Sequence, residues 1–387
     1  MTGLGDPGAT DAYGTGRHSP LLPGYALVHA DLHNHTRLSD GRGDPRLAFD
    51  SMRAAGLDAA AITDHTNLPG PWGGGLDDDG WSELEELARK SNRDGEFVAI
   101  RGFEWSHPLL GHVNVWDSPT WIAPVLPTGK DMPRFYDWLE SSDSAEALTS
   151  FNHPGSRGTV LRFGNFEFRV ALAARMVGLE MFNKTDDYLL AFERGGVSPL
   201  VQCLDAGWRP GLIGVTDEHG KDWGHPDGKG RTGLYVSELS RGGVREAMVA
   251  RRSFAARVKG LRLAATLGGA FMGQRLRQPV LAGTQPLAVD LDLGPLASGM
   301  ELSVQLLRWA PVTPVVEEVA RVESGAGLLE VEVRIDPDEP WVVLRVSDPH
   351  SPAGWGVPRA YGSLGRSVAY ASPWWVSGLP RANPPAR

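Results

Sequence analysis

The chain of 387 residues has a single cysteine, no long apolar run and no excess of basic charge. With Cys203 alone, neither a disulfide framework nor a thiolate zinc cluster can form. No uncharged apolar stretch approaches the length of a bilayer span, and residues 1–24 contain no apolar core of signal-peptide length. We therefore expect no membrane association, a cytoplasmic location by default, and a flexible N-terminal tail over residues 1–24.

Acidic side chains outnumber basic ones, 47 Asp and Glu against 38 Lys and Arg, which gives a net charge of −9. Non-specific affinity for nucleic acid depends on a basic face that neutralises phosphates. The composition therefore argues against a nucleic-acid partner and favours a small-molecule substrate. The length accommodates one barrel of about 250 residues and a smaller second domain. It leaves the oligomeric state open.

Short apolar runs that end in metal-ligand residue types recur along the first part of the chain. Residues 26–32 predict a buried strand that delivers His33 and His35, which share a face because side chains in a strand repeat with a period of two. A helix is predicted from Asp44-Pro45 to Gly56, and a second buried strand, residues 57–62, leads into Asp64-His65. Barrels of the (β/α) type carry their chemistry at these strand ends, which favours a site over unrelated core histidines.

Four further runs have the same character. Residues 97–100, 148–153, 177–183 and 212–219 lead, in order, to Glu104 with His112, to His153, to Glu180, and to Asp217 with His219. Imidazole nitrogen and carboxylate oxygen are donors that hold zinc, manganese or iron, and a bridging carboxylate keeps two ions close together. The pattern predicts a site for divalent metal ions, with a bridging carboxylate able to hold two of them.

Taken in order, the motifs of this chain resemble those of the PHP (polymerase and histidinol phosphatase) superfamily of metal-dependent hydrolases. They are HNH, SDG, ITDH, GFEW with GHVNV, FNHPG, GLEMFN and VTDEH. The resemblance covers residues 26–255 and implies a distorted (β/α)7 barrel, which we assign to residues 25–256. The short gap between Glu104 and His112, the HPG loop and a β-rich tail are most similar to the CehA/McbA-like branch.

The resemblance also implies a centre of two or three divalent metal ions and a distribution of their ligands. A first ion would be bound by His33, His35, Glu104 and Asp217, and Glu104 would bridge to a second ion held by His112 and His153. A third ion would use Asp40, His65 and His219; several family members have histidine in place of Asp40, so its occupancy stays open. The catalytic group would be a metal-bound water held by Glu104, Asp217 and His219.

Other residues near the motifs are candidates for supporting roles. Asp64 is expected to orient a ligating imidazole from behind, and Glu180 is either a ligand or a support. Arg157 and Lys184 are the favoured phosphate-binding side chains, with Arg231 a further candidate by position. Tryptophans beside the motifs, including Trp72, Trp105 and Trp223, either line a substrate pocket or fill the core.

After residue 256 the apolar period changes to two. A helix predicted over residues 243–252 closes the barrel, and alternating stretches follow at 261–267, 287–293, 302–309, 328–335 and 341–346. Turn-forming residues separate these stretches, which is typical of antiparallel sheet. We therefore predict a small, sandwich-like β-rich domain over residues 257–387.

Three functions remain open at this point. A phosphoesterase acting on a small phosphorylated metabolite or nucleotide fits the chemistry best, because several metals match the several oxygens of a phosphoryl group. The branch resemblance implies instead a carbamate, ester or amide hydrolase. The third is a non-catalytic binding module derived from the PHP fold.

Overall fold

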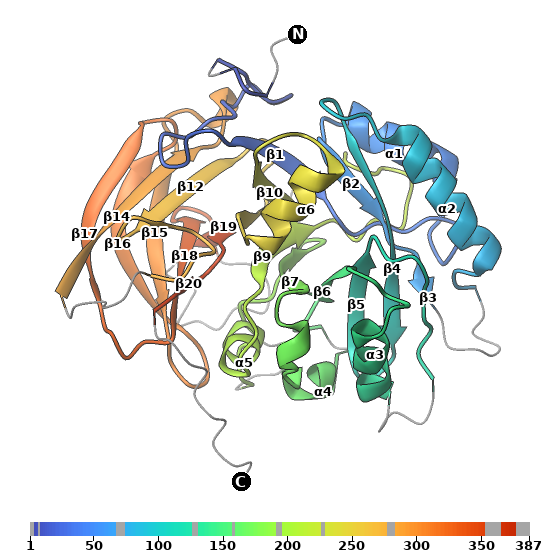
Figure 1. Ribbon diagram of the computed structural model, residues 1–387. Helices are drawn as coiled ribbons and strands as arrows, with labels where there is room; N and C mark the ends of the chain where they lie inside the picture. The colour runs from blue at the N-terminus through green and yellow to red at the C-terminus, as the bar shows by residue number, and fades with distance from the viewer. Residues whose placement is uncertain are drawn as a thin grey trace.

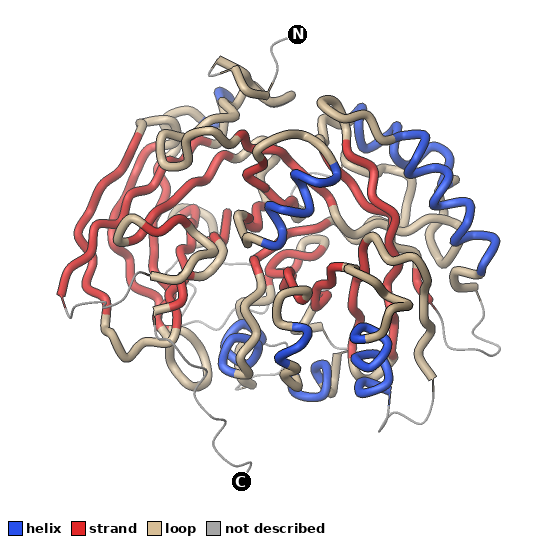
Figure 2. Tube along the Cα trace, viewed as in Figure 1, coloured by secondary structure: helices blue, strands red, loops and turns tan. Residues whose placement is uncertain are grey.

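The computed structural model describes residues 4–6, 8–66, 74–125, 131–156, 159–190, 196–225, 229–276, 283–352 and 365–376. Strands dominate one side of the molecule, and most helices lie on the other side and along its lower face in the view (Figures 1 and 2). The helices are α1 Pro45–Ala54, α2 Asp78–Ser91, α3 Asp131–Glu140, α4 Arg162–Phe166, α5 Pro199–Asp205 and α6 Arg241–Val249, with 3-10 turns η2 Val170–Leu172 and η3 Pro295–Ala297. In the described part of the chain, no helix has the length and apolar character needed to cross a bilayer.

The strands of the first part are β1 Ala26–Asp31, β2 Ala59–Ile62, β3 His65–Thr66, β4 Val98–His107, β5 Gly111–Trp116, β6 Leu148–Asn152, β7 Met176–Asn183, β8 Asp186–Asp187, β9 Gly211–Val215, β10 Arg231–Val236 and β11 Ser253–Ala256. Those of the second part are β12 Arg262–Leu267, β13 Ala270–Phe271, β14 Gly283–Asp292, β15 Glu301–Arg308, β16 Val315–Glu323, β17 Leu328–Ile335, β18 Trp341–Asp348, β19 Arg366–Ala371 and β20 Trp374–Trp375.

The first helix shows how local sequence fixes an element. Asp44 accepts a hydrogen bond from the backbone N–H of Arg46, and Pro45 occupies the first turn, where its missing N–H is not needed. The apolar face formed by Ala48, Phe49 and Met52 is buried. This helix connects β1 to β2, which pair in parallel, as the sequence predicts.

The large sheet mixes parallel and antiparallel pairs. Strands β1, β2 and β4 are parallel neighbours, as are β6, β7 and β9, but β5 lies antiparallel between β4 and β6. Strand β4 runs on past residue 100 to His107 and returns as β5 after a short turn, which leaves no room for a crossover helix. The mixed α/β class is confirmed, whereas a regular (β/α)7 alternation is not.

The sheet curls so that β9 lies against β10 and β11. A Cβ on Gly214 would lie 2.6 Å from the carbonyl oxygen of Arg231, which explains the glycine at this position. The Thr232 hydroxyl donates to the Gly214 carbonyl at 2.7 Å and accepts from the Gly214 N–H at 3.2 Å. The curl brings the chain segments that follow β1 and β9 side by side.

The second part of the chain is antiparallel, as predicted. Strands β16, β15, β18 and β19 continue the large sheet through the β11–β19 pair, while β13, β12, β14 and β17 form a separate four-stranded sheet. Side chains from both sheets, including Leu263, Val289, Val304 and Val342, share one buried core. The boundary predicted between residues 256 and 257 follows directly after β11.

The described residues before β1 are docked, where the sequence predicts a flexible tail. Arg17 forms a buried double hydrogen bond with Asp58, at 2.9 and 2.8 Å. Asp11 lies 2.9 Å from His29 Nε2, and both side chains are buried. The contacts with Asp58 and His29 therefore hold this segment in place.

Candidate metal centre

Backbone hydrogen bonds between the segments after β1 and β9 bring the first ligand types together. The Asp217 N–H donates to the His33 carbonyl at 3.0 Å, and the His35 N–H donates to the Glu218 carbonyl at 2.9 Å. His33 and His35 are fully buried, and their Nε2 atoms lie 3.0 Å apart. Both imidazoles therefore point into one small space with Asp217.

Glu104, in β4, lies at the middle of this space and is fully buried. Five imidazoles approach its carboxylate. Its Oε1 lies 3.2 Å from His33 Nε2, 3.2 Å from His112 Nδ1 and 3.4 Å from His153 Nε2, and its Oε2 lies 2.6 Å from His65 Nδ1 and 3.7 Å from His35 Nε2. Asp217, by comparison, has three imidazoles within 4 Å.

Asp217 and Asp40 form the other side of the centre. Asp217 Oδ1 lies 3.2 Å from His35 Nε2 and 3.2 Å from His219 Nδ1, and its Oδ2 lies 3.1 Å from Lys184 Nζ. Asp40 Oδ1 lies 3.3 Å from His219 Nε2 and 3.5 Å from His65 Nε2. The Asp40 side chain is 56% exposed, so this end of the centre opens toward solvent.

The ligand atoms fall into three overlapping groups, in each of which all atoms lie within 4.8 Å of one another. The groups are His33, His35 and Asp217; His65, Glu104 and His112; and His35, Asp40, His65 and His219. The grouping differs from the predicted distribution in three respects. Glu104 is absent from the group of His33, His35 and Asp217, although its Oε1 lies 3.2 Å from His33 Nε2. His65 accompanies Glu104 and His112 where His153 was expected, and His35 also belongs to the group that contains Asp40.

The residues present fit divalent metal ions. Four buried atoms of the centre have no hydrogen-bond partner: His35 Nδ1, Glu104 Oε2, His112 Nδ1 and Asp217 Oδ1. Buried acceptors without donors are costly, and a cation would satisfy the carboxylate oxygens directly. The donors are only nitrogen and oxygen, which suits zinc, manganese or iron.

The charges of the side chains agree with this fit. Burial raises the pKa of Glu104, but the charges of His112, His33 and His65 outweigh burial and hold it well below its usual range. Burial also raises the pKa of Asp217, but His33 and His35 outweigh burial and hold this pKa well below its usual range. Burial and the neighbouring His65 lower the pKa of His35 to about 3. The carboxylates are therefore ionised and His35 is neutral, as metal ligands must be. Burial lowers the pKa values of His33, His65 and His153, but Glu104 and the other carboxylates outweigh burial and raise them, so these imidazoles would have to release a proton to a bound cation.

Glu180, in β7, supports the centre from behind. Its Oε1 accepts from His33 Nδ1 at 2.8 Å, and its Oε2 accepts from the His153 N–H at 2.7 Å and from Asn183 Nδ2 at 2.9 Å. With its oxygens engaged in this way, Glu180 acts in this geometry as a support for two histidines.

Asp64 does not make the expected hydrogen bond to an imidazole. It accepts hydrogen bonds from the Thr36 N–H and hydroxyl, at 2.7 and 2.8 Å, and from the Ser39 hydroxyl at 2.6 Å. Its role is to hold the loop between His35 and Asp40. The residue beside His65 is instead Ser106, whose Oγ lies 2.6 Å from His65 Nδ1.

The predicted substrate-binding cations have different positions. Lys184 lies at the centre through Asp217, whereas Arg157 falls outside the described residues. Arg231 does not face the centre: it is buried and donates to the carbonyls of Gly230 and Gly224.

The tryptophans beside the motifs belong to the core. Trp105 is fully buried and stacks on Phe135, with ring centroids 4.6 Å apart. Trp223 is buried and its indole N–H donates to the His35 carbonyl at 3.0 Å. Trp72 lies outside the described residues.

Two residues that the sequence prediction omitted contribute to the centre. Asn152 Nδ2 donates to Glu104 Oε1 at 2.8 Å, and Ser106 lies beside His65. Asn152 directly precedes His153 in the FNHPG motif, and Ser106 follows Glu104 by two residues in the same strand. Because side chains alternate along a strand, Ser106 lies on the same face of β4 as Glu104, a relation that is visible only once residues 101–107 are known to form a strand.

Comparison with known proteins gives no close relative. No family model and no curated protein matches the sequence. Among solved structures, the chain is similar to a two-domain protein from Bacteroides vulgatus containing a predicted PHP-like metal-dependent phosphoesterase, with 16% identity, a TM-score of 0.47, and coverage of 92% of this chain and 97% of that one.

Two other structures match over shorter stretches. One is a putative metal-dependent phosphoesterase from Bifidobacterium adolescentis, with 16% identity, a TM-score of 0.29, and coverage of 57% of this chain and 95% of that one. The other is an amidohydrolase from Chromobacterium violaceum, with 16% identity, a TM-score of 0.31, and coverage of 51% and 90%. None of the three is described as CehA/McbA-like, so that branch stays a prediction. Because all three TM-scores lie below 0.5, we assign no function from these likenesses.

Proposed function

We propose that this chain is a metal-dependent hydrolase that acts as a phosphoesterase on a small phosphorylated metabolite or nucleotide. The observation that carries the proposal is the convergence of six imidazoles on two buried carboxylates, Glu104 and Asp217. A carboxylate lined by imidazoles, with buried oxygens that lack hydrogen-bond donors, is a cation site by its chemistry.

Three sets of side chains would hold the ions. His33, His35 and Asp217 form one set, His65, Glu104 and His112 a second, and Asp40 and His219 with His35 and His65 a third. When bound, such ions lower the pKa of a water molecule toward neutrality and offset negative charge on substrate oxygens. Glu104 Oε2 and Asp217 Oδ1, which lack hydrogen-bond donors, and the adjacent His219 would hold and orient that water.

Lys184 supports a phosphoryl substrate over a neutral one. Its Nζ lies 3.1 Å from Asp217 Oδ2, and its side chain is 47% exposed, so the ammonium group is at the centre and reachable from solvent. A lysine ammonium binds a phosphoryl oxygen as a point charge. Trp105 and Trp223 are buried and offer no aromatic rim for an aryl group. We propose Arg157 as a second phosphate-binding cation because it follows the His153 loop.

The decisive experiment is a hydrolase screen of the protein reconstituted with zinc, manganese or iron. Phosphomonoesters, cyclic and linear phosphodiesters, and aryl carbamates and esters would be offered side by side. We expect metal-dependent release of phosphate from a phosphomonoester. Turnover of carbamates or aryl esters alone would favour the CehA/McbA-type alternative. Less than one equivalent of transition metal after reconstitution would favour the non-catalytic binding module.

A further inference from the structure

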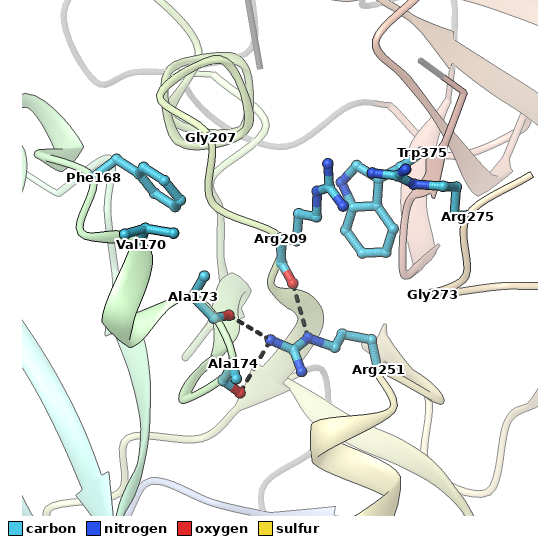
Figure 3. Close-up of a pocket in the computed structure, with 10 residues that line it drawn as sticks. All are labelled: Phe168, Val170, Ala173, Ala174, Gly207, Arg209, Arg251, Gly273, Arg275 and Trp375. Carbon is cyan, nitrogen blue, oxygen red and sulfur yellow. Dashed lines mark hydrogen bonds between the residues drawn. The ribbon is translucent and has the colours of Figure 1, made fainter. Parts of the chain in front are cut away.

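A second hollow lies away from the metal centre, between the two parts of the chain. It has a volume of about 480 Å³, which is within the range of small-molecule sites. One wall comes from the segment between α4 and β7, with Phe168 and Val170, and the facing wall comes from Arg275 and Trp375 (Figure 3). Arg209 and Arg251 also line the hollow.

Strands β7 and β9 separate this hollow from the metal centre. Arg209 precedes the first residue of β9 by two positions, and Asp217 follows its last residue by two. Eight residues of extended chain span about 26 Å. At the same end of β7, the Met176 carbonyl accepts from Arg251, whereas Glu180, farther along this strand, contacts His33. A ligand in the hollow would not touch the metal ligands.

The lining is rich in positive charge and contains no acid. Three of the ten residues that form it are arginines, and none is aspartate or glutamate. Burial, followed by the charge of Arg275, lowers the pKa of Arg209, and burial with the charge of Arg209 lowers the pKa of Arg251 to about 10. Within the described chain, no carboxylate offsets either shift. Like charges held close together repel even where they are only partly buried, as Arg209 is, and a bound anion would relieve that repulsion.

The charge of Arg251 is built into the fold. Its guanidinium donates to the carbonyls of Arg209 and Ala173, both at 2.9 Å, and to that of Ala174 (Figure 3). It also donates to the Val249 carbonyl. Gly273 allows this packing, because a Cβ there would lie 2.0 Å from the Arg251 carbonyl oxygen and its φ is +84°. Arg251 thus ties three segments together and leaves its charge without a counter-ion among the described residues.

Trp375 adds an independent sign of a missing partner. Trp375 is only 7% exposed, and its indole N–H has no hydrogen-bond partner in the described structure. A tryptophan N–H can only donate, so it calls for an acceptor. Figure 3 shows the Arg209 and Arg275 side chains extending toward the Trp375 ring. Phe168 and the exposed Val170 supply apolar surface opposite.

We propose that this hollow binds a small organic anion, in which a carboxylate or phosphate group is attached to a flat apolar ring. Arg209, Arg275 and the Trp375 indole N–H receive the anionic group, and the ring packs against Phe168 and Val170. The site is separate from the metal centre, so the proposal stands whether or not the chain is a phosphoesterase.

The test is a titration of the full-length protein with phenylphosphonate and with benzoate, followed by the indole N–H signals of its tryptophans in ¹H–¹⁵N NMR. The Trp375 signal is identified as the one missing from Trp375→Phe. We expect one of the two anions to shift this signal at millimolar concentration or below, and neutral benzamide to leave it unchanged. Comparing the two anions distinguishes a phosphate from a carboxylate group.

Charge variants complete the test. Arg209→Gln and Arg275→Gln should each weaken binding about tenfold, because each removes charge-assisted hydrogen bonds. Arg89→Gln, at a 69% exposed side chain on α2, is the matched control and should bind as the original chain does. The proposal is overturned if neither anion shifts the Trp375 signal, if benzamide shifts it equally, or if both arginine variants bind normally. Arg251 is not varied, because its loss would disturb the fold.

Discussion

His33 donates a hydrogen bond from Nδ1 to Glu180 Oε1 at 2.8 Å, and both side chains are fully buried. With the Nδ1 proton fixed there, Nε2 is the nitrogen directed toward His35 Nε2, at 3.0 Å, and Glu104 Oε1, at 3.2 Å. Glu180 therefore sets both the tautomer and the direction of a predicted metal ligand. Through the His153 N–H it also fixes the start of the HPG loop.

The first prediction concerns this carboxylate. Glu180→Gln keeps the size of the side chain but turns one acceptor oxygen into a donor, so it cannot accept from His33, His153 and Asn183 together. We expect metal affinity and turnover to fall by about 10–100-fold. Calorimetric titration with zinc or manganese measures the affinity. Glu317→Gln, at an exposed ion pair with Arg308, serves as the control. Unchanged metal affinity in Glu180→Gln would refute the supporting role.

The second prediction concerns the ligands themselves. Glu104→Ala removes the carboxylate that five imidazoles approach, and His33→Ala removes a nitrogen shared by Glu104 and Asp217. Each should abolish turnover and lower the bound metal while the far-UV circular dichroism stays that of a folded chain. Element analysis of the purified variants measures the metal content. Near-normal activity in either variant would end the metal-site assignment.

A chelator provides a third, independent check. Removal of metal should abolish hydrolysis, and zinc, manganese or iron should restore it, because the chain offers no cysteine nucleophile near the centre: Cys203 is buried in the core. Activity should return only with an ion that also raises the melting temperature, since an ion that binds only the folded state stabilises it. Full activity in the metal-free protein would contradict the proposed function.

The fourth prediction separates substrate classes through Lys184. Lys184→Met removes the ammonium group beside Asp217 but keeps the length of the side chain. For a phosphomonoester we expect kcat/KM to fall about 100-fold, in the range seen when one charge-stabilising donor is lost. Lys184→Arg should retain most of the activity because it keeps the positive charge. An equal loss on a neutral aryl ester would show that Lys184 acts on the metal ligands and not on substrate charge.

The fifth prediction concerns acid stability at the Asp11–His29 contact. Burial raises the pKa of Asp11, but the hydrogen bond and charge of His29 and the N–H groups of Thr15 and Tyr13 outweigh burial and lower it. A carboxyl group with a lowered folded-state pKa adds stability above its unfolded pKa of about 3.9, and this contribution is lost as the pH falls through the folded value. The free energy of unfolding measured with urea should therefore lose this contribution below about pH 4 in the original chain, whereas in Asp11→Asn the contribution is absent at every pH. If the free energy of unfolding changed with pH in the same way in both proteins, the stabilising role of the Asp11–His29 contact would be contradicted.

The sequence predicts those elements whose signals are local. Asp44-Pro45 marks the start of α1, and the apolar residues 148–152 mark β6, because capping and strand length depend on neighbouring residues. The ligand residue types at the strand ends could also be predicted from the sequence. The antiparallel return of β4 as β5 could not, because residues 101–107 are too polar to be recognised as a strand until the partner strand is known.

The grouping of the ligands depends on distances that spacing along the chain does not contain. His33 and His35 lie in the segment that follows β1, and not in a strand, so their directions are set by pairing with Asp217 and Glu218. That pairing brings His35 within reach of Asp40 as well as Asp217. The hollow at Arg209 was likewise invisible, because its lining comes from five separate segments of the chain.

The pairing of β19 with β11 has a consequence for how the chain can be divided. Phe254, Ala255 and Ala256 lie opposite residues 369–371 in the antiparallel pair, and their side chains are buried. Without residues 257–387, β11 would become an unprotected outer strand with apolar side chains, and such strands recruit other chains into intermolecular sheets. By covering the edge of β11, the C-terminal strands therefore prevent aggregation through this edge. The metal-binding part expressed alone is expected to precipitate or to form β-paired oligomers.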